Sequence, residues 1–243
     1  MNFETPLLPG RLIKRYKRFL ADVTLDTGEV VTAHCPNTGS MKNCQPDNGR
    51  VWLRFVDDPK RKLKYTWELV EIDQEFLACI NTGRANGLVR EAIENNRIPQ
   101  LPFGDDGYTN LKAEVRYGEE KSRIDFLLQG NNLPDCYLEV KNVTLLAEDS
   151  QNGQGFFPDA KTERGTKHLR ELARIVEAGH RAVLFYNVAH TGIKSIEAAK
   201  HIDPVYTETL NKVLDEGVEV MGFGCSISPD EITITQPIPF IRP

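Results

Sequence analysis

Two short segments of the chain carry charged side chains within otherwise apolar sequence. Asp125 is the single carboxylate of residues 124–128, and Glu139 and Lys141 are separated by one residue in a later segment. Because neighbouring side chains of a strand point to opposite faces, Glu139 and Lys141 would project from the same face, about 7 Å apart. A carboxylate buried without a partner destabilises a fold by several kcal/mol, so Asp125 requires a cation or a hydrogen-bond donor.

These three side chains predict a site for a divalent cation and for phosphate chemistry. If the two segments are neighbouring strands, Asp125 and Glu139 converge on one ion, and Mg²⁺ or Mn²⁺ is bound by oxygen ligands of this kind. Lys141 would orient or deprotonate a water molecule and neutralise charge on a phosphodiester oxygen. The alternative is a surface pair of Glu139 and Lys141, with Asp125 capping a loop. Because both segments are otherwise apolar, the metal site is favoured.

Other charged residues extend the predicted site. Glu91 lies on the flank of the apolar stripe of a helix predicted at 86–94, so it is a candidate third metal ligand. An exposed helix glutamate is the alternative interpretation. Glu114 is a comparable candidate. Three basic residues follow Gly165 at the start of a later helix, where DNA phosphates can be bound: Lys167, His168 and Arg170.

Two features of this later helix allow further interpretation. His168 adjoins Leu172 on one helical face, so a packed, neutral histidine is an equal alternative to a DNA contact. Residues 162–165, just before the helix, are predicted to form a loop that becomes ordered on DNA.

Two basic runs predict contact with a phosphate backbone. The net charge of the chain is −5, which argues against coating of nucleic acid by bulk charge. Local runs of basic residues are more informative about phosphate binding than the net charge, although many such runs are only solvated surface. The first run, with Tyr16 as a base-stacking candidate, is predicted to bind DNA and contains Arg11, Lys14, Arg15, Lys17 and Arg18. The second contains Lys60, Arg61, Lys62 and Lys64.

The elements that position these side chains fall into two regions of different periodicity. The first region has short apolar segments separated by turn residues, which predict strands at 15–25, 29–35, 51–56, 65–72 and 76–80. About five short strands need closure to protect their edges, so a small β-barrel is expected over residues 1–81.

The second region, residues 82–243, predicts an α/β domain. Helices are expected at 86–94 with Asn86 as the cap, from Gly165 to a C-terminal cap at Gly179, and at 204–215. Strands are expected at 111–117, 122–128, 136–145, 181–188 and 218–222, with a short strand near the end of the chain.

The charged segments resemble the Asp…Glu-x-Lys core of the PD-(D/E)XK nuclease superfamily. Ile124 precedes Asp125 in place of proline, which that superfamily tolerates. The short pattern alone is common by chance. A wider resemblance, over essentially the whole chain, is to the sugar fermentation stimulation protein A family. It is carried by Pro36-Asn37-Thr38-Gly39-Ser40-Met41, Asn142-Val143-Thr144-Leu145, Phe157-Pro158-Asp159-Ala160, Thr162-Glu163-Arg164-Gly165 and Lys167-His168-Leu169-Arg170-Glu171-Leu172.

This resemblance implies an N-terminal OB-like barrel and a PD-(D/E)XK restriction-endonuclease-like C-terminal α/β domain. It also implies non-specific DNA binding and a suggested role in regulating maltose metabolism. The barrel would then hold the DNA backbone, and Asp125, Glu139 and Lys141 would form the catalytic set.

The residues are compatible with three functions. The favoured one is a cytoplasmic DNA-binding protein with a Mg²⁺-dependent nuclease site. A DNA-binding regulator with an inactive nuclease fold is the second, and a metal-dependent enzyme for a small phosphorylated metabolite is the third. The start of the sequence lacks a signal-peptide pattern, no long apolar stretch occurs, and the five cysteines are scattered, so export and membrane insertion are not expected. The oligomeric state is open, and a homo-oligomer is compatible with the sequence.

Overall fold

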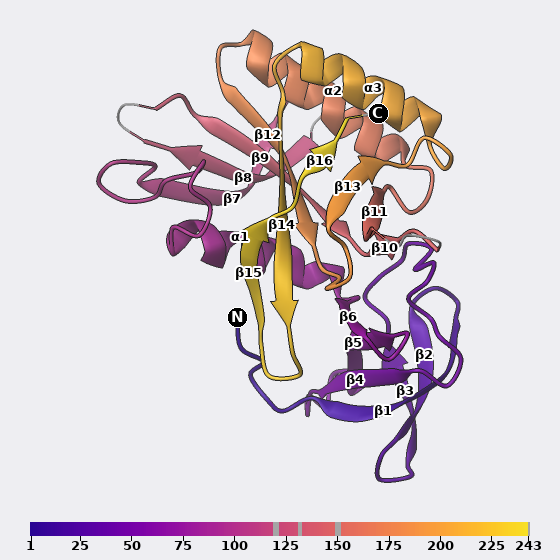
Figure 1. The fold of residues 1–243 in the computed structure, drawn as a ribbon. Helices are drawn as coiled ribbons and strands as arrows, with labels where there is room; N and C mark the ends of the chain where they lie inside the picture. Colours follow the sequence, from indigo (N-terminus) through magenta and orange to yellow (C-terminus); the bar gives the residue numbers. More distant parts are fainter. Residues whose placement is uncertain (119–121, 131–132, 149–151, 243) are drawn as a thin grey trace.

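The computed structural model describes residues 1–118, 122–130, 133–148 and 152–242. Figure 1 shows a barrel of strands, coloured indigo and purple, below a twisted sheet that is flanked by helices. The chain passes from the first part to the second through a 3₁₀ turn, Thr82–Arg84. A barrel followed by an α/β domain is the predicted fold class, which is confirmed.

The barrel contains the strands β1 (Leu8–Tyr16), β2 (Leu20–Leu25), β3 (Val30–His34), β4 (Arg50–Phe55), β5 (Tyr65–Ile72) and β6 (Phe76–Cys79). They are ordered β3-β2-β1-β4-β5-β6, and a further pairing of β3 with β5 closes the barrel. Alternate side chains fill its interior, among them Ala21 and Val23 of β2 and Val51 and Leu53 of β4. Trp67 of β5 is fully buried in the same core.

The first strand of the barrel differs from the prediction. The predicted strand 15–25 is the end of β1, a turn and then β2. The chain reverses at Lys17 and Arg18, whose φ angles of 49° and 65° are incompatible with a continuous strand. The start of β1 could not be predicted from the sequence, because Pro9 and Gly10 are residues that are rare in strands.

The second domain is built on a sheet of the order β15-β14-β12-β9-β8-β7. Its strands are β7 (Asn110–Tyr117), β8 (Ser122–Gln129), β9 (Cys136–Val143), β12 (Arg181–Val188), β14 (Glu219–Ile227) and β15 (Ile232–Pro237). The strands β7, β8 and β9 are antiparallel, whereas β9, β12 and β14 are parallel to one another. This sheet carries both of the charged segments.

Helices cover both faces of this sheet (Figure 1). The helix α1 (Ala85–Glu94) turns its apolar side, including Leu88, into a core that it shares with Phe126 and Phe185. The helices α2 (Glu163–Glu177) and α3 (Pro204–Asp215) share a second core with Tyr186. No helix in the described ranges is long and apolar enough to cross a membrane.

Two helix starts differ from the prediction. Arg84 is the residue before α1, and Asn86 lies within its first turn rather than capping it. The helix α2 begins at Glu163, with Thr162 as its cap, so residues 162–165 are not the predicted loop. The hydroxyl of Thr162 accepts a hydrogen bond from the backbone N–H of Gly165, which is why the helix starts early.

A small side sheet was not predicted. It contains β10 (Leu145–Leu146), β11 (Gln154–Phe157), β13 (Ser195–Ala198) and β16 (Phe240–Ile241) in the order β10-β11-β13-β16. A short strand near the end of the chain was expected, and β16 lies there. The other strands of this sheet are too short for an apolar pattern to reveal their pairing.

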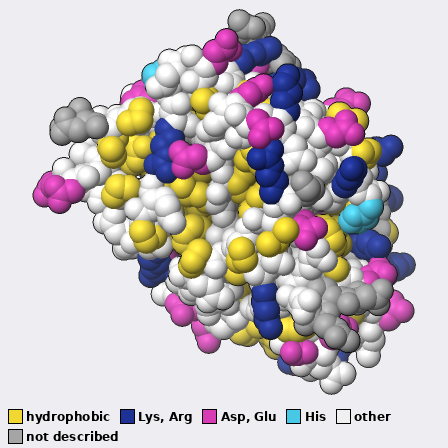
Figure 2. Space-filling view, turned by 45° about the horizontal axis from the view of Figure 1, so that its top comes forward, with side chains coloured by type: hydrophobic (Ala, Val, Ile, Leu, Met, Phe, Trp, Pro, Cys, Tyr) yellow, Lys and Arg dark blue, Asp and Glu magenta, His cyan; other side chains and the backbone are white. Residues whose placement is uncertain are grey.

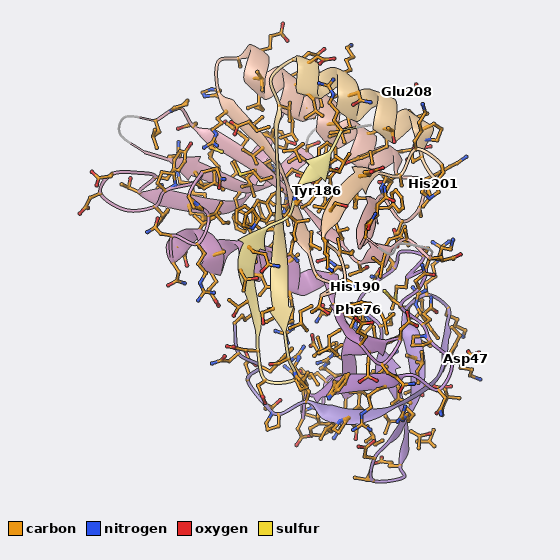
Figure 3. All side chains as sticks on the ribbon, viewed as in Figure 1. Asp47, Phe76, Tyr186, His190, His201 and Glu208 are labelled. Atoms are coloured by element: carbon orange, nitrogen blue, oxygen red, sulfur yellow. The ribbon has the colours of Figure 1, made fainter. Side chains whose placement is uncertain are left out.

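The two domains are joined by more than the linker. The backbone N–H of Cys79 donates to the carbonyl oxygen of Ala189 at 2.9 Å. The ring centroids of Phe76 and His190 lie 5.8 Å apart at the same junction. Figure 3 labels both residues there. At the start of the chain, the backbone N–H of Phe3 donates to the backbone carbonyl oxygen of Asp230 in the second domain.

Candidate functional site

The segments that carry Asp125 and Glu139 are neighbouring antiparallel strands. Phe126 of β8 pairs with Leu138 of β9. The pairing ends there, and Asp125 and Glu139 are the next residues of the two strands, close enough for the charge of Glu139 to raise the pKa of Asp125. The strands therefore bring the two carboxylates together.

Both carboxylate oxygens of Asp125 accept hydrogen bonds. Oδ1 accepts from Nδ2 of Asn86 at 2.8 Å, and Oδ2 accepts from the backbone N–H of Val140 at 2.7 Å. Burial raises the pKa of Asp125, and the charge of Glu139 raises it further. A cation close to both carboxylates would relieve this repulsion.

Glu139 is buried at the centre of the site, with 2% of its surface exposed. Its Oε1 lies 2.6 Å from Nζ of Lys141 and also contacts Nδ1 of His168. Although burial opposes ionisation, the hydrogen bond from His168 and the charge of Lys141 lower the pKa of Glu139. Its Oε2 is buried and has no hydrogen-bond partner among the described residues. A cation would satisfy this oxygen.

His168 belongs to this buried cluster rather than to an exposed DNA-binding surface. Only 5% of its surface is exposed, and its Nδ1 lies 3.5 Å from Nζ of Lys141. Its Nε2 accepts from Nε of Arg164 at 3.4 Å. The position of His168 on the apolar face of α2, beside Leu169, is the sequence signal for this placement.

Two residues next to the cluster were not predicted. The hydroxyl of Tyr117, at the end of β7, is buried and has no hydrogen-bond partner in the described part of the chain. Burial raises the pKa of Tyr117, as do the charges of Glu139, Glu171 and Asp125. Glu171 is fully buried on α2 and accepts a hydrogen bond from Arg174 at 2.7 Å. Its signal was its position three residues after His168 on one helical face.

The structure does not bring the other candidate carboxylates into the cluster. Glu91 accepts from the amino group of Met1 at 2.9 Å and lies 3.6 Å from Arg97. Glu91 lies more than one helical turn beyond Asn86, and its carboxylate is paired with Met1 and Arg97, so its role as a metal ligand stays a prediction. Glu114 is exposed in β7.

Asp125 and Glu139 are the carboxylates available for a metal ion at this site. The described residues contain no group of three or more His, Cys, Asp or Glu side chains arranged to hold a metal. Two carboxylates beside a lysine suit Mg²⁺, which keeps several water ligands, better than an ion that needs a closed protein cage.

The first basic run divides into exposed and occupied side chains. Arg11, Lys14, Lys17 and Arg18 are exposed on the barrel. Arg11 also donates to the carbonyl oxygen of Asn48 at 3.3 Å, and Nζ of Lys14 lies 3.9 Å from Asp22. Arg15 is half-buried, and its guanidinium donates to several backbone carbonyl oxygens of the barrel. Arg15 therefore fastens the local fold instead of presenting its charge to solvent.

The other basic residues are dispersed. In the second run, Lys64 pairs with Asp57 at 2.9 Å, and Arg61 donates to Thr66 at 3.0 Å. On α2, Arg170 is exposed and Lys167 is partly buried. On the face shown in Figure 2, Lys and Arg side chains are interspersed with Asp and Glu, without one continuous basic strip.

The fold and the site define a two-domain protein in which an OB-like barrel precedes an α/β domain that carries a buried charged cluster. The family model "SfsA N-terminal OB domain" matches residues 13–80. The model "Sugar fermentation stimulation protein RE domain" matches residues 83–231. The chain therefore belongs to the sugar fermentation stimulation protein family, which confirms the resemblance in the sequence.

Relatives match the chain over nearly its whole length. A sugar fermentation stimulation protein homolog of Marinomonas sp. is 56% identical over 243 residues, covering 100% of this chain and 91% of the relative. A homolog of Pseudoalteromonas atlantica is 52% identical over 241 residues, covering 99% of this chain and 100% of the relative. The structure of Pyrococcus furiosus SfsA in complex with Ca²⁺ matches with a TM-score of 0.85 at 24% identity, covering 99% of this chain and 98% of that chain. This last match shows a shared fold.

Proposed function

We propose that this chain is a cytoplasmic, non-specific DNA-binding protein with a Mg²⁺-dependent phosphodiesterase site, acting in the regulation of sugar metabolism. The observation that carries the proposal is the convergence of Asp125, Glu139 and Lys141 on adjoining strands. Five free cysteines, all buried, are compatible with a reducing compartment.

The donor set of the site fits a divalent cation. Glu139 offers a buried oxygen without a donor among the described residues, and Asp125 lies close enough to be affected by its charge. The Pyrococcus furiosus relative is described in complex with Ca²⁺, another cation that is bound by oxygen ligands. When bound, Mg²⁺ would supply charge stabilisation for a phosphate group in displacement by water.

The chain itself supplies positioning and positive charge. The contact with Glu139 holds Nζ of Lys141 at a fixed place, from which it can orient the attacking water and stabilise negative charge on the phosphate. His168 is a positioning residue, since it contacts the same oxygen of Glu139. Asn86 acts in the same way on Asp125.

The barrel is the proposed holder of the DNA backbone. Its exposed basic side chains, Arg11, Lys14, Lys17 and Arg18, are suited to phosphate contacts. On the second domain, Arg170 is exposed and suited to the same role, with Lys167 beside it. Contacts of this type carry no base sequence information, which fits non-specific binding.

A paired assay tests the proposal: DNA retention titrated against salt, and cleavage of the same DNA with Mg²⁺ or Mn²⁺. Asp125→Asn and Lys141→Met are expected to lower cleavage at least about 100-fold and to leave salt-sensitive DNA retention close to that of the wild type. Lys112→Met is the matched control, because Lys112 is an exposed lysine of β7. Undiminished cleavage by Asp125→Asn would overturn the catalytic assignment.

The second candidate is a DNA-binding regulator without nuclease activity. It is favoured by one observation: Oε1 of Glu139 is already occupied by Lys141 and His168, which compensate its charge without a metal ion. Salt-sensitive DNA retention without cleavage at any Mg²⁺ or Mn²⁺ concentration would support this candidate.

A further inference from the structure

A cavity with both polar and apolar walls lies beside Lys141, where the barrel meets the second domain. Its volume is about 290 Å³, close to the lower end of the roughly 300–1,000 Å³ found for small-molecule sites. The barrel contributes residues 37–39 to its wall, and the second domain contributes Asn86, Lys141, Asn142 and Phe156. The barrel is therefore part of the surroundings of the candidate catalytic lysine.

Hydrogen bonds from another residue of the barrel, Arg15, hold the loop that forms the barrel side of this cavity. The guanidinium of Arg15 donates to the carbonyl oxygens of Asn37 at 2.8 Å, Gly39 at 3.0 Å and Ser40 at 3.4 Å. A planar guanidinium can hold several carbonyl groups in one arrangement, which the single ammonium of a lysine cannot. Arg15 thus fixes a loop that has no regular secondary structure of its own.

The same loop is also fastened from the second domain. Oδ2 of Asp159 accepts from Oγ of Ser40 and from the backbone N–H of Met41, each at 3.2 Å. The approach is so close that a Cβ atom on Gly39 would lie 2.5 Å from the same oxygen. A loop held from both sides forms a preorganised wall, which lowers the entropy lost when a ligand binds.

The groups in the wall match the parts of a nucleotide. Lys141 suits a phosphate, and the ring of Phe156 suits a base or sugar. The NH₂ group of Asn86 is used by Asp125, which leaves its carbonyl oxygen as an acceptor. The carbonyl oxygen of Asn142 accepts from Asn187, which leaves its NH₂ group as a donor.

We propose that this cavity binds one unpaired nucleotide of a DNA strand, next to the phosphate that Lys141 contacts. The proposal rests on the proposed function and adds a preference for single-stranded or frayed DNA. The cavity has the size of a single nucleotide, so a base pair must open before one of its nucleotides enters.

The experiment compares two labelled probes in Ca²⁺: an oligo-dT strand and a covalently closed duplex with the same number of phosphates. Thr38→Phe places a large side chain in the wall of the cavity, and because Thr38 is exposed the fold should tolerate it. Thr27→Phe, at the exposed turn after β2, is the matched control, and Thr38→Ser keeps the hydroxyl. Thermal melting verifies that each variant is folded.

The wild type is expected to bind the single strand at least about tenfold more tightly than the closed duplex, an effect comparable to stacking of one base. Thr38→Phe should remove this preference without weakening duplex binding, whereas Thr27→Phe and Thr38→Ser should retain it. Equal binding of both probes by the wild type, or an unchanged preference in Thr38→Phe, overturns the inference alone. Failure to bind either probe overturns the proposed function as well.

A competition measurement separates a DNA strand from a free nucleotide as the occupant. dTMP is added to the complex with labelled oligo-dT, and an unlabelled strand is added in parallel at the same nucleotide concentration. The strand is expected to compete more strongly, because its neighbouring phosphates contact the basic residues of the barrel. Equal competition by dTMP would overturn the assignment to a strand.

Discussion

The side chain of Asn86 donates a 2.8 Å hydrogen bond to Oδ1 of Asp125, which ties the first turn of α1 to β8. Since Oδ2 of Asp125 is held by Val140, this bond fixes the remaining orientation of the carboxylate. We expect Asn86→Ala to lower metal-dependent cleavage about 10–100-fold, as is usual when the partner of a metal ligand is removed. Initial rates measured across a Mg²⁺ titration test this.

Asn95→Ala is the matched control for Asn86→Ala. Its Nδ2 donates at 2.8 Å to the carbonyl oxygen of Glu91 at the other end of the same helix. This substitution removes a comparable hydrogen bond far from Asp125 and should leave the Mg²⁺ titration unchanged. Identical titrations for the two variants would show that Asn86 does not position Asp125.

His190 should make the stability of the protein depend on pH. It is buried at the domain junction beside Phe76 (Figure 3), and its Nδ1 accepts from the backbone N–H of Gly192 at 3.0 Å. Burial lowers the pKa of His190 to about 4. Between the unfolded pKa of about 6.5 and this value, the unfolded chain binds the additional proton, so stability falls as the pH falls.

The expected loss from His190 between pH 7 and pH 5 is about 2 kcal/mol in the free energy of unfolding. Urea unfolding at both pH values measures it as the difference between the wild type and His190→Gln, in which this loss should be absent. His201→Gln is the control, because His201 is exposed. Equal pH dependence in the wild type and His190→Gln would contradict the prediction.

Gly118 is required where β7 approaches the buried Glu171. Its φ angle is +69°, and a Cβ atom there would lie 1.6 Å from Oε2 of Glu171. We expect Gly118→Ala to lower the free energy of unfolding by roughly 1–2 kcal/mol because of the strained backbone conformation. The steric clash with Glu171 should lower it by roughly a further 1–3 kcal/mol. Urea unfolding at neutral pH measures the sum.

Gly28→Ala separates these two contributions. Gly28 has a φ angle of +89°, and a Cβ atom there would meet nothing within 4 Å among the described residues. This variant should therefore show only the backbone loss. If Gly28→Ala and Gly118→Ala lowered the free energy of unfolding equally, the steric clash with Glu171 would not contribute to the destabilisation.

Much of the fold could be predicted where a segment carries its own pattern. The strand β12 and the helix α3 have the predicted bounds, because one is an unbroken apolar run and the other starts with Asp203 and Pro204, a cap and a first-turn residue. The short strands of the side sheet could not be predicted, because their pairing depends on distant segments.

The candidate site shows the same limit. Asp125, Glu139 and Lys141 could be proposed from the spacing of residues in two strands. The contact of His168 with Glu139 joins residues 29 apart in sequence, and that of Asn86 with Asp125 joins residues 39 apart. Both contacts depend on how α1 and α2 pack on the sheet, which local periodicity does not specify.

The turn between β1 and β2 should contribute DNA contacts that depend on salt. Lys17 and Arg18 are exposed there, whereas the neighbouring Arg15 is engaged by carbonyl oxygens. Each lost phosphate contact lowers the slope of log K against log salt by about one. We expect this change for Lys17→Ala and Arg18→Ala, and a smaller one for Arg15→Ala. DNA retention titrated with NaCl measures the slopes.

Lys212→Ala serves as the control for these variants, because Lys212 is an exposed lysine of α3, outside the barrel. Its slope should equal that of the wild type. Arg15→Ala should instead weaken binding of the single strand more than that of the closed duplex, since it releases residues 37–40 beside the cavity. If Lys17→Ala and Lys212→Ala had the same slope as the wild type, the turn would not contact DNA, and the phosphate-binding surface would have to lie elsewhere on the protein.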